Sequence, residues 1–153
     1  MKVRIELVDD DEEIVIKCKQ ITQEIQKLQS KLETNDLIQN HKMLLTLGNE
    51  DHIVDISNVL FFESETNKVL AHTTSRIYGT TLKLYEIEEI LPKNFMRISK
   101  SCIVNINKVS WYNKEITGNG KAGFANTEKQ IYVSRMYFKD FIKNINEMRG
   151  IIK

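Results

Sequence analysis

The chain has 153 residues and a formal net charge of +1, with 41% hydrophobic and 28% charged residues. This composition excludes a disordered or fibrous chain and predicts one main globular domain. No apolar run approaches the roughly 20 residues that cross a bilayer, and no signal-peptide pattern opens the chain, so we expect a cytoplasmic protein. Cys18 and Cys102 form no CxxC pair, which argues against a disulfide framework or a zinc site and predicts two reduced, partly buried thiols.

Positive charge is concentrated in the second half of the sequence. Residues 1–39 carry six basic and nine acidic side chains, whereas residues 93–143 carry ten basic and three acidic ones. A small net charge alone argues weakly against a nucleic-acid binder. The asymmetry, however, is what a phosphate-binding surface produces.

Residues 1–39 predict a small strand-strand-helix extension. Apolar and polar residues alternate over 3–7 and 14–18, on either side of an acidic turn that resembles a phosphoreceiver pocket but is followed by no receiver-like pattern. A helix over about 22–34 is predicted by an apolar stripe with spacings of four, three and four residues: Ile21, Ile25, Leu28 and Leu32. Such a module is too small to be stable alone. Packing on its own chain and a dimer contact both remain open.

From residue 41 onward, short strand-like runs follow one another with turn signals between them. They are predicted at 43–47, 53–56, 59–63, 69–73, 77–78, 95–99, 103–106, 109–112, 115–117, 123–125 and 130–133. Two helices interrupt them. Thr81 is expected to cap the first, which ends at Pro92, and Ser134 is expected to cap the second, at the C-terminus. The pattern predicts a mainly β, α+β fold with antiparallel sheets.

A polar corner lies between two of these strands. Met96 and Ile98 alternate with Arg97 and Ser99, and after the corner the alternation resumes through residues 102–107. Lys100 is therefore expected at the rim of a sheet, exposed to an anionic partner.

The order of these elements resembles the LytTR DNA-binding domain family. The resemblance covers about residues 41–148 and rests on the following separated runs: Val59-Leu60-Phe61-Phe62-Glu63, Lys68-Val69-Leu70-Ala71-His72, Thr81-Leu82-Lys83, Leu91-Pro92, Arg97-Ile98-Ser99-Lys100-Ser101, Ile103-Val104-Asn105 and Val133-Ser134-Arg135. It implies an elongated, mostly β fold that binds promoter DNA in bacterial transcription regulators, through loops that enter successive major grooves. It also implies a stand-alone, receiver-free regulator type, whose members are often paired with a restraining membrane protein.

Three base-reading positions follow from the resemblance. They are Asn67 beside Lys68, Lys100 in the polar corner, and Arg135 at the start of the last helix. Many family members have His at the position of Ser99. An independent physical argument favours Arg135, because a cation in the first helical turn opposes the helix dipole unless an anion binds there.

A second group of residues is expected to contact phosphate or to support the reading turns. Arg97 is the least secure phosphate candidate, since bracing of the corner is the favoured alternative for it. The group consists of Lys68, Arg97, Ser99, Ser101, Ser134, Lys108, Lys139 and Lys143.

No catalytic or metal-ligating pattern stands out. His41, His52 and His72 are scattered, and Gly118-Asn119-Gly120 is explained by a hairpin turn rather than a phosphate cradle. We therefore expect no enzyme activity, cofactor or metal.

The alternative to promoter binding is a protein-interaction module of the same fold. The expected partners are duplex DNA, a second copy of the chain and a membrane-protein regulator, whereas the operator and the controlling signal stay open.

Overall fold

The structure is a computed structural model that describes residues 14–33 and 41–152. The chain divides into two units, residues 1–36 and 37–153. The described part of the first unit contains α1 (Gln23–Glu33), which confirms the predicted helix. The hydroxyl of Thr22 accepts a hydrogen bond from the Ile25 N–H at 3.3 Å and caps this helix.

The predicted strand over 14–18 is wrong, because these residues form no sheet pairing. Ile14 and Val15 are 73% and 60% exposed, so their alternation does not reflect burial of one face of a strand. The other predicted strand, over 3–7, lies outside the described residues. None of the residues of α1 is buried, although its apolar stripe is present.

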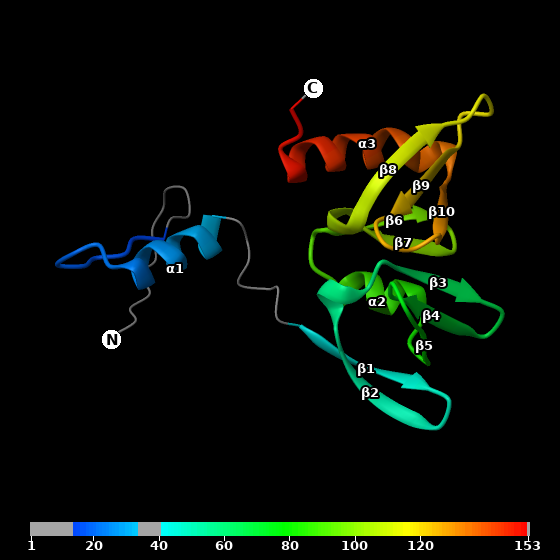
Figure 1. Ribbon diagram of the computed structural model, residues 1–153, viewed down its shortest axis with the longest axis horizontal. Helices are drawn as coiled ribbons and strands as arrows, with labels where there is room; N and C mark the ends of the chain where they lie inside the picture. The colour runs from blue at the N-terminus through cyan, green and yellow to red at the C-terminus, as the bar shows by residue number, and fades with distance from the viewer. Residues whose placement is uncertain (1–13, 34–40, 153) are drawn as a thin grey trace. The chain divides into compact units, whose positions relative to one another are not determined.

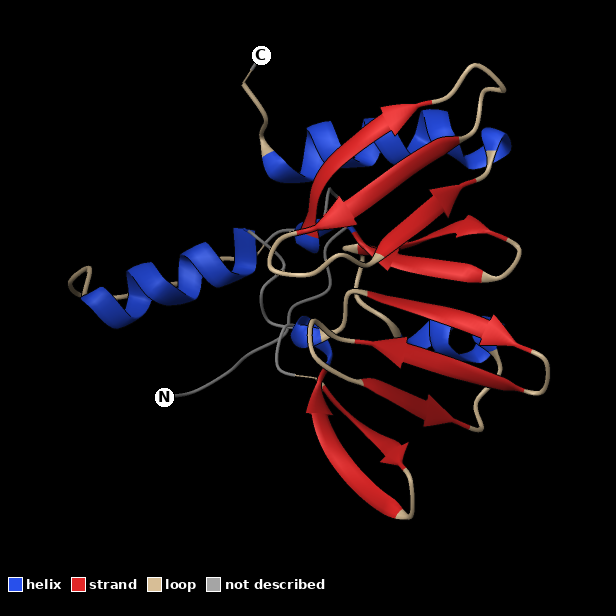
Figure 2. Cartoon of the chain, turned by 45° about the vertical axis from the view of Figure 1, so that its right-hand side comes forward, coloured by secondary structure: helices blue, strands red, loops and turns tan. Residues whose placement is uncertain are grey.

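The second unit consists of two antiparallel sheets with helices packed on them (Figures 1 and 2). The larger sheet has the order β2-β1-β5-β4-β3-β7-β6, and the smaller has the order β10-β9-β8. The strands are β1 (Lys42–Leu47), β2 (Glu50–Asp55), β3 (Phe61–Glu65), β4 (Lys68–His72), β5 (Ile77–Thr80), β6 (Phe95–Ser99), β7 (Cys102–Asn105), β8 (Val109–Lys114), β9 (Gly120–Phe124) and β10 (Gln130–Val133). The helices are α2 (Leu84–Ile90), α3 (Arg135–Arg149) and the short 3-10 helices η2 (Ile56–Asn58) and η3 (Ile106–Lys108).

Two hydrophobic cores lie on opposite faces of the neighbouring strands β3 and β7. Successive side chains of a strand point to opposite faces, so Phe61 enters the core beneath the smaller sheet and α3, whereas Phe62 enters the core that contains α2. Val104 and Ile103 of β7 divide in the same way. All four residues of β7 are buried. Continuous apolar runs in these strands therefore reflect burial on both faces.

Two local predictions in this unit are wrong, and a third is confirmed only in part. Residues 115–117 form a turn rather than a strand. Helix α2 begins at Leu84 instead of following Thr81, because Glu86 accepts a hydrogen bond from the Lys83 N–H at 2.7 Å and fixes the first turn there. Ser134 occupies the N-cap position of α3 but forms no side-chain capping bond.

The two thiols lie in different environments. Cys102 is buried at the start of β7, where loss of hydration raises the pKa of its thiol. Cys18 is exposed, which corrects the expectation that both cysteines are partly buried. Within the described residues, no helix is long and apolar enough to cross a membrane.

Candidate nucleic-acid interface

Several connections between strands converge at one edge of the second unit (Figures 1 and 2). The β3–β4 turn lies beside the β6–β7 turn, because Glu63 pairs with Cys102 in the antiparallel register of β3 and β7. The Ser64 N–H also donates a hydrogen bond to the Ser101 carbonyl at 2.8 Å. These contacts bring the predicted positions Asn67 and Lys100 to neighbouring turns of one edge.

The connection from β10 to α3 joins the same edge. The Ser134 N–H donates a hydrogen bond to the Ile98 carbonyl at 2.9 Å, so the start of α3 lies beside the end of β6. Arg135 follows immediately and is exposed. The two connections that carry the predicted cations Lys100 and Arg135 therefore lie at one edge rather than at opposite ends of the unit.

The β6–β7 turn is held by Arg97. Its Nε and Nη2 atoms contact Glu88 Oε2 of α2 at 2.8 and 2.7 Å, and its Nη1 atom donates to the Lys100 carbonyl at 2.8 Å. Ser99 adds a hydrogen bond within the turn, since its hydroxyl accepts from the Ser101 N–H at 3.2 Å. A register shift between Arg97 and Ser99 bends the end of β6 at this turn. Lys100 itself remains exposed.

The β3–β4 turn presents Asn67 and Lys68, which are both exposed. The residue with a positive φ in this turn is Thr66, at 45°. The left-handed backbone conformation that often explains asparagine in turns is therefore taken by its neighbour. A backbone requirement does not account for Asn67.

A groove of about 650 Å³ separates the β6–β7 turn from the smaller sheet. Its lining includes Ser99 and Ser101, which flank Lys100, and Ser134, which precedes Arg135. The groove thus borders both connections that carry the predicted cations.

His72 lies in the wall of this groove and is only 8% exposed. Its ring stacks on Phe61 with centroids 4.2 Å apart, and its Nε2 atom lies 3.4 Å from Glu63 Oε2 without forming a hydrogen bond. Burial, reinforced by the positive charge of Lys129, lowers the pKa of His72 to about 4. The imidazole is therefore neutral at pH 7, and the contact with Glu63 is not an ion pair at that pH.

Lys129 does not extend toward solvent as a free cation. Its Nζ atom donates to the carbonyls of Thr73 and Arg76 at 2.7 and 3.4 Å. Partial burial lowers the pKa of its ammonium group. This lysine therefore joins the β4–β5 connection to the groove wall rather than adding to the exposed charge.

Two predicted phosphate contacts lie along α3 and a third lies elsewhere. Lys139 and Lys143 are exposed on α3, which begins at the edge and runs away from it (Figure 1). At a rise of about 1.5 Å per residue, Lys143 lies roughly 12 Å along the axis from Arg135. The structure does not bring Lys108 to the edge.

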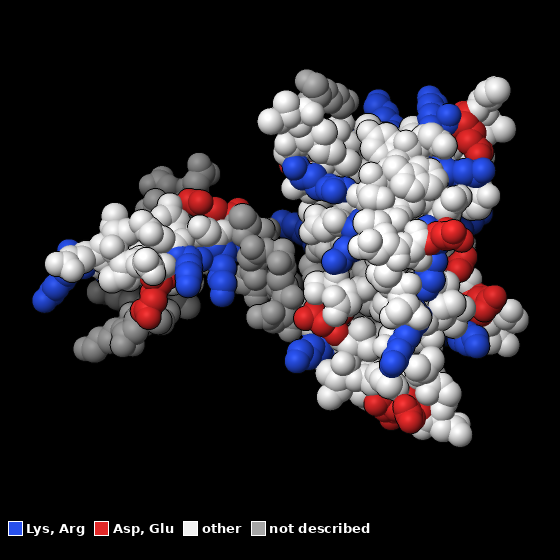
Figure 3. Space-filling model, in the orientation of Figure 1, with Lys and Arg blue, Asp and Glu red and all other residues white. Residues whose placement is uncertain are grey.

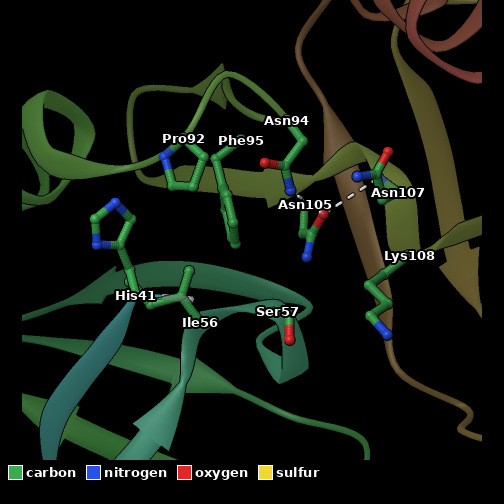
Figure 4. Close-up of a pocket in the computed structure, with 9 residues that line it drawn as sticks. All are labelled: His41, Ile56, Ser57, Pro92, Asn94, Phe95, Asn105, Asn107 and Lys108. Carbon is green, nitrogen blue, oxygen red and sulfur yellow. Dashed lines mark hydrogen bonds between the residues drawn. The ribbon is translucent and has the colours of Figure 1, made fainter. Parts of the chain in front are cut away.

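Lys108 lines a hollow of about 200 Å³ at the opposite ends of the strands (Figure 4). Asn94 precedes β6, and Asn105 ends β7, so the hollow lies a full strand length from the β6–β7 turn. Asn105 is buried and fully engaged, because it donates to the Val59 carbonyl at 3.0 Å and accepts from Asn94 at 2.9 Å. Its side-chain amide links Val59, Asn94 and the Asn107 N–H of η3, which indicates a structural role.

The exposed charge differs between the two ends of the unit (Figure 3). In that view, acidic side chains gather over the β1–β2 hairpin, which contains Glu50 and Asp51, whereas basic side chains prevail over the smaller sheet and α3. Arg135 forms no ion pair within residues 41–152, in contrast to Arg97. The described residues also contain no group of three or more side chains suited to holding a metal ion.

Sequence reasoning missed the contribution of the β8–β9 turn to this edge. The Arg135 N–H donates a hydrogen bond to Asn119 Oδ1 at 2.9 Å, so the missing cap of α3 comes from another hairpin. The only sequence signal was Gly118-Asn119-Gly120, which indicates a turn but not what the turn contacts.

The chain is similar to known transcriptional regulators. An uncharacterized HTH-type transcriptional regulator of Staphylococcus aureus strain MRSA252 is 32% identical over 126 residues, which cover 76% of each chain. A relative of the same description from strain NCTC 8325 is 41% identical over 71 residues, which cover 46% of this chain and 48% of the relative.

A solved structure shares the fold. It is the LytTr DNA-binding domain of a Bacillus cereus protein described as a methyl-accepting/DNA response regulator, with a TM-score of 0.62 and 22% identity. The match covers 72% of this chain and 97% of that domain. The model of the LytTr DNA-binding domain family matches residues 49–146, close to the range of 41–148 expected from the sequence. The chain therefore belongs to the LytTr DNA-binding domain family.

Proposed function

We propose that this protein is a cytoplasmic transcription regulator that recognises promoter DNA through the turns at one edge of its β domain. The observation that carries the proposal is the convergence of the β3–β4, β6–β7 and β10–α3 connections, each with an exposed polar or basic residue. Major grooves admit such protruding elements, and base edges within them offer distinct hydrogen-bonding patterns. The S. aureus relatives, which are described as transcriptional regulators, support the same function.

The proposed roles divide the polar residues of the edge into readers and supports. Asn67, Lys100 and Arg135 would read bases, since arginine and lysine can donate to guanine and asparagine can pair with adenine. The proposed phosphate contacts, which set position without reading sequence, are Lys68, Lys139 and Lys143. The proposed supports of the turns are Arg97, Ser99, Ser101 and Ser134.

The contacts of Arg97 favour a bracing role over a phosphate contact. Its guanidinium group is shared between Glu88 and the Lys100 carbonyl, and its side chain is only 19% exposed. An arginine bound in this way has few donors left for DNA. Arg135, which is exposed and free of ion pairs within residues 41–152, retains its full fork of donors.

Selection of bound sequences from a random duplex pool tests this function. The purified chain should enrich a defined site, and its affinity for that site should fall steeply with salt, with a log–log slope near −0.9 for each phosphate contacted. Scrambled duplex of equal length serves as the control. Failure to enrich any sequence, or an affinity insensitive to salt, would contradict the proposal.

We infer that α1 joins two copies of the protein on DNA. None of its residues is buried, and its stripe of Ile25, Leu28 and Leu32 has the spacing of a short coiled-coil seam. In an antiparallel pair, Glu24 of one copy would face Lys31 of the other. Light scattering of the chain and of a Leu28→Glu variant tests this inference, since only the parent should have twice the monomer mass. A monomeric parent would contradict the inference and would favour a contact between this face of α1 and a regulatory protein.

A further inference from the structure

We propose that Gly118 and Asn119 of the β8–β9 turn are positioning residues that set the direction of the Arg135 side chain and thereby the base preference of the protein. The proposal rests on the function proposed above, because it concerns how one reading residue is held. It assigns a role to a hairpin that carries none of the predicted reading residues.

The first contact fixes the backbone of Arg135. Its N–H donates to Asn119 Oδ1 at 2.9 Å, whereas the side chain of Ser134, at the N-cap position, makes no capping bond. In most helices, the side chain of the N-cap residue itself accepts a hydrogen bond from a backbone N–H of the first turn. Here the first residue of α3 is instead tied to a turn that precedes it by 16 residues.

The second contact fixes the side chain of Arg135. A Cβ atom built on Gly118 would lie 2.6 Å from Arg135 Cδ and 3.0 Å from Arg135 Cγ. The aliphatic part of Arg135 therefore lies directly against the glycine Cα, in space that any larger residue would fill. Gly118 also has a φ of +89°, a conformation that glycine adopts without the penalty other residues incur.

The turn that makes both contacts is closed by its own hydrogen bonds. The Gly118 N–H donates to the Glu115 carbonyl at 3.0 Å, and the Glu115 N–H donates to the Asn119 carbonyl at 2.8 Å. The turn thus holds Gly118 and Asn119 in a fixed relation to each other and presents them together to Arg135.

Such support matters because arginine recognises guanine with two donors in a fixed fork. A free arginine side chain loses rotamer freedom when it binds, and a side chain already held in one direction loses less. Binding groups also need support from surrounding contacts to keep a productive geometry. Since one contact holds the backbone of Arg135 and the other holds the aliphatic stem of its side chain, together they restrict where the guanidinium group can reach while leaving its donors free.

The test compares base preference in matched variants. For each protein, affinity is measured for the duplex selected from the random pool, for that duplex with the contacted guanine replaced, and for random duplex. Arg135→Ala identifies the contacted guanine. Asn119→Ala should reduce the preference for guanine by about threefold to tenfold, within the range that a bidentate contact supplies. Its affinity for random duplex should change by less than about twofold, since phosphate contacts remain.

Two variants separate positioning from a general structural effect. Asn119→Asp retains the acceptor oxygen, so it should keep the guanine preference while its added negative charge weakens binding to every duplex alike. Asn113→Ala, an exposed asparagine of the same hairpin, should match the parent in every measurement. An unchanged preference in Asn119→Ala, or an equal loss in Asn119→Ala and Asn119→Asp, would overturn the proposal.

A measurement without DNA keeps the proposal separate from the function on which it rests. The heteronuclear ¹⁵N NOE of Arg135 Nε reports the order of the side chain. It should fall in Asn119→Ala and in Gly118→Ala, and stay unchanged in Asn113→Ala. If the parent enriched no duplex, the proposed function would fail, and the NOE would still decide the positioning. Equal NOE values in the parent and Asn119→Ala would refute it.

Discussion

The turn that carries Lys100 and the connection that carries Arg135 lie on the same edge but are held in different ways. The Lys100 turn is braced largely by its own hairpin, through Arg97 and Ser99, with Glu88 of the preceding helix as an anchor. The Arg135 connection is braced by Asn119, which belongs to a different hairpin. One support is local in sequence, and the other depends on how two elements pack.

Because of this difference, substitutions should affect the two connections differently. Changes near Lys100 act within one short stretch of chain, so their effects should stay confined to that turn. The direction of Arg135 depends on the smaller sheet as a whole, because the β8–β9 turn must arrive at the right place. We therefore expect base preference to be more sensitive than affinity to distant changes in that sheet.

The largest expected effect is on stability, and it comes from His72, which lines the groove beside the Lys100 and Arg135 connections. His72 has a pKa lowered to about 4 from its ordinary value of 6.5 by burial and by Lys129. The unfolded chain takes up the proton below pH 6.5, whereas the folded chain resists until about pH 4. The free energy of unfolding should therefore fall between pH 6.5 and 4, by up to about 3 kcal/mol from this group.

Urea unfolding at pH 7, 5.5 and 4 measures this loss in the parent and in His72→Phe. The variant retains an aromatic ring against Phe61 but has no proton to gain. It should lose less stability on acidification, and the difference between the two proteins cancels the titration of carboxylates elsewhere. If the free energies of unfolding of the two proteins fell equally with pH, the titration of His72 would not contribute to the loss of stability.

Removal of the guanidinium group should have the next largest effect. Arg135→Ala is expected to lose about 1–3 kcal/mol of discrimination between the selected duplex and one with the contacted guanine replaced. Fluorescence anisotropy with the two duplexes measures the difference. Equal losses on selected and random DNA would indicate that Arg135 contacts phosphate only.

Loss of the local brace should act on stability and on the Lys100 turn together. Arg97→Met keeps the aliphatic stem but removes the bonds to Glu88 and to the Lys100 carbonyl. We expect a loss of about 1 kcal/mol in the free energy of unfolding, because the ion pair is partly exposed. Amide hydrogen exchange should become faster at Ser101 and remain unchanged at Arg135. Faster exchange at both would remove the distinction between local and distant support.

The smallest effect is expected for a phosphate contact away from the turns. Lys143→Ala should weaken binding to all duplexes alike and reduce the magnitude of the log–log salt slope by about 0.9. Lys108→Ala is a matched control, since this lysine lines the hollow at the far ends of the strands. An equal change in both variants would show that the salt effect reflects net charge rather than position.

Most strands could be predicted because a buried strand requires apolar residues in a continuous or alternating run. Strands 95–99 and 130–133 were predicted with the bounds that the structure has, since each is flanked by polar turn residues. The strand predicted at 115–117 was wrong for a physical reason. Ile116 is fully exposed at the tip of the β8–β9 turn, and an apolar residue in an exposed turn resembles one in a strand.

Part of the candidate site could be predicted from the sequence, and part could not. Lys100 and Arg135 could be placed by the resemblance and by local charge, and the structure brings their connections to one edge. Asn119 could not be identified, because its contact with Arg135 depends on the approach of two elements 16 residues apart. The roles of all these residues in DNA binding stay predictions until the variants are measured.

The division of β3 and β7 between two cores has a consequence for errors in folding. A shift of β3 by one residue would exchange the faces of Phe61 and Phe62, and a shift of β7 would exchange those of Ile103 and Val104, so either shift would disturb both cores at once. Misaligned pairings are thus penalised twice, and the correct alignment is also the one that sets Asn67 beside Lys100. The spacing of the turns that carry Asn67 and Lys100 thus depends on the packing of buried apolar side chains.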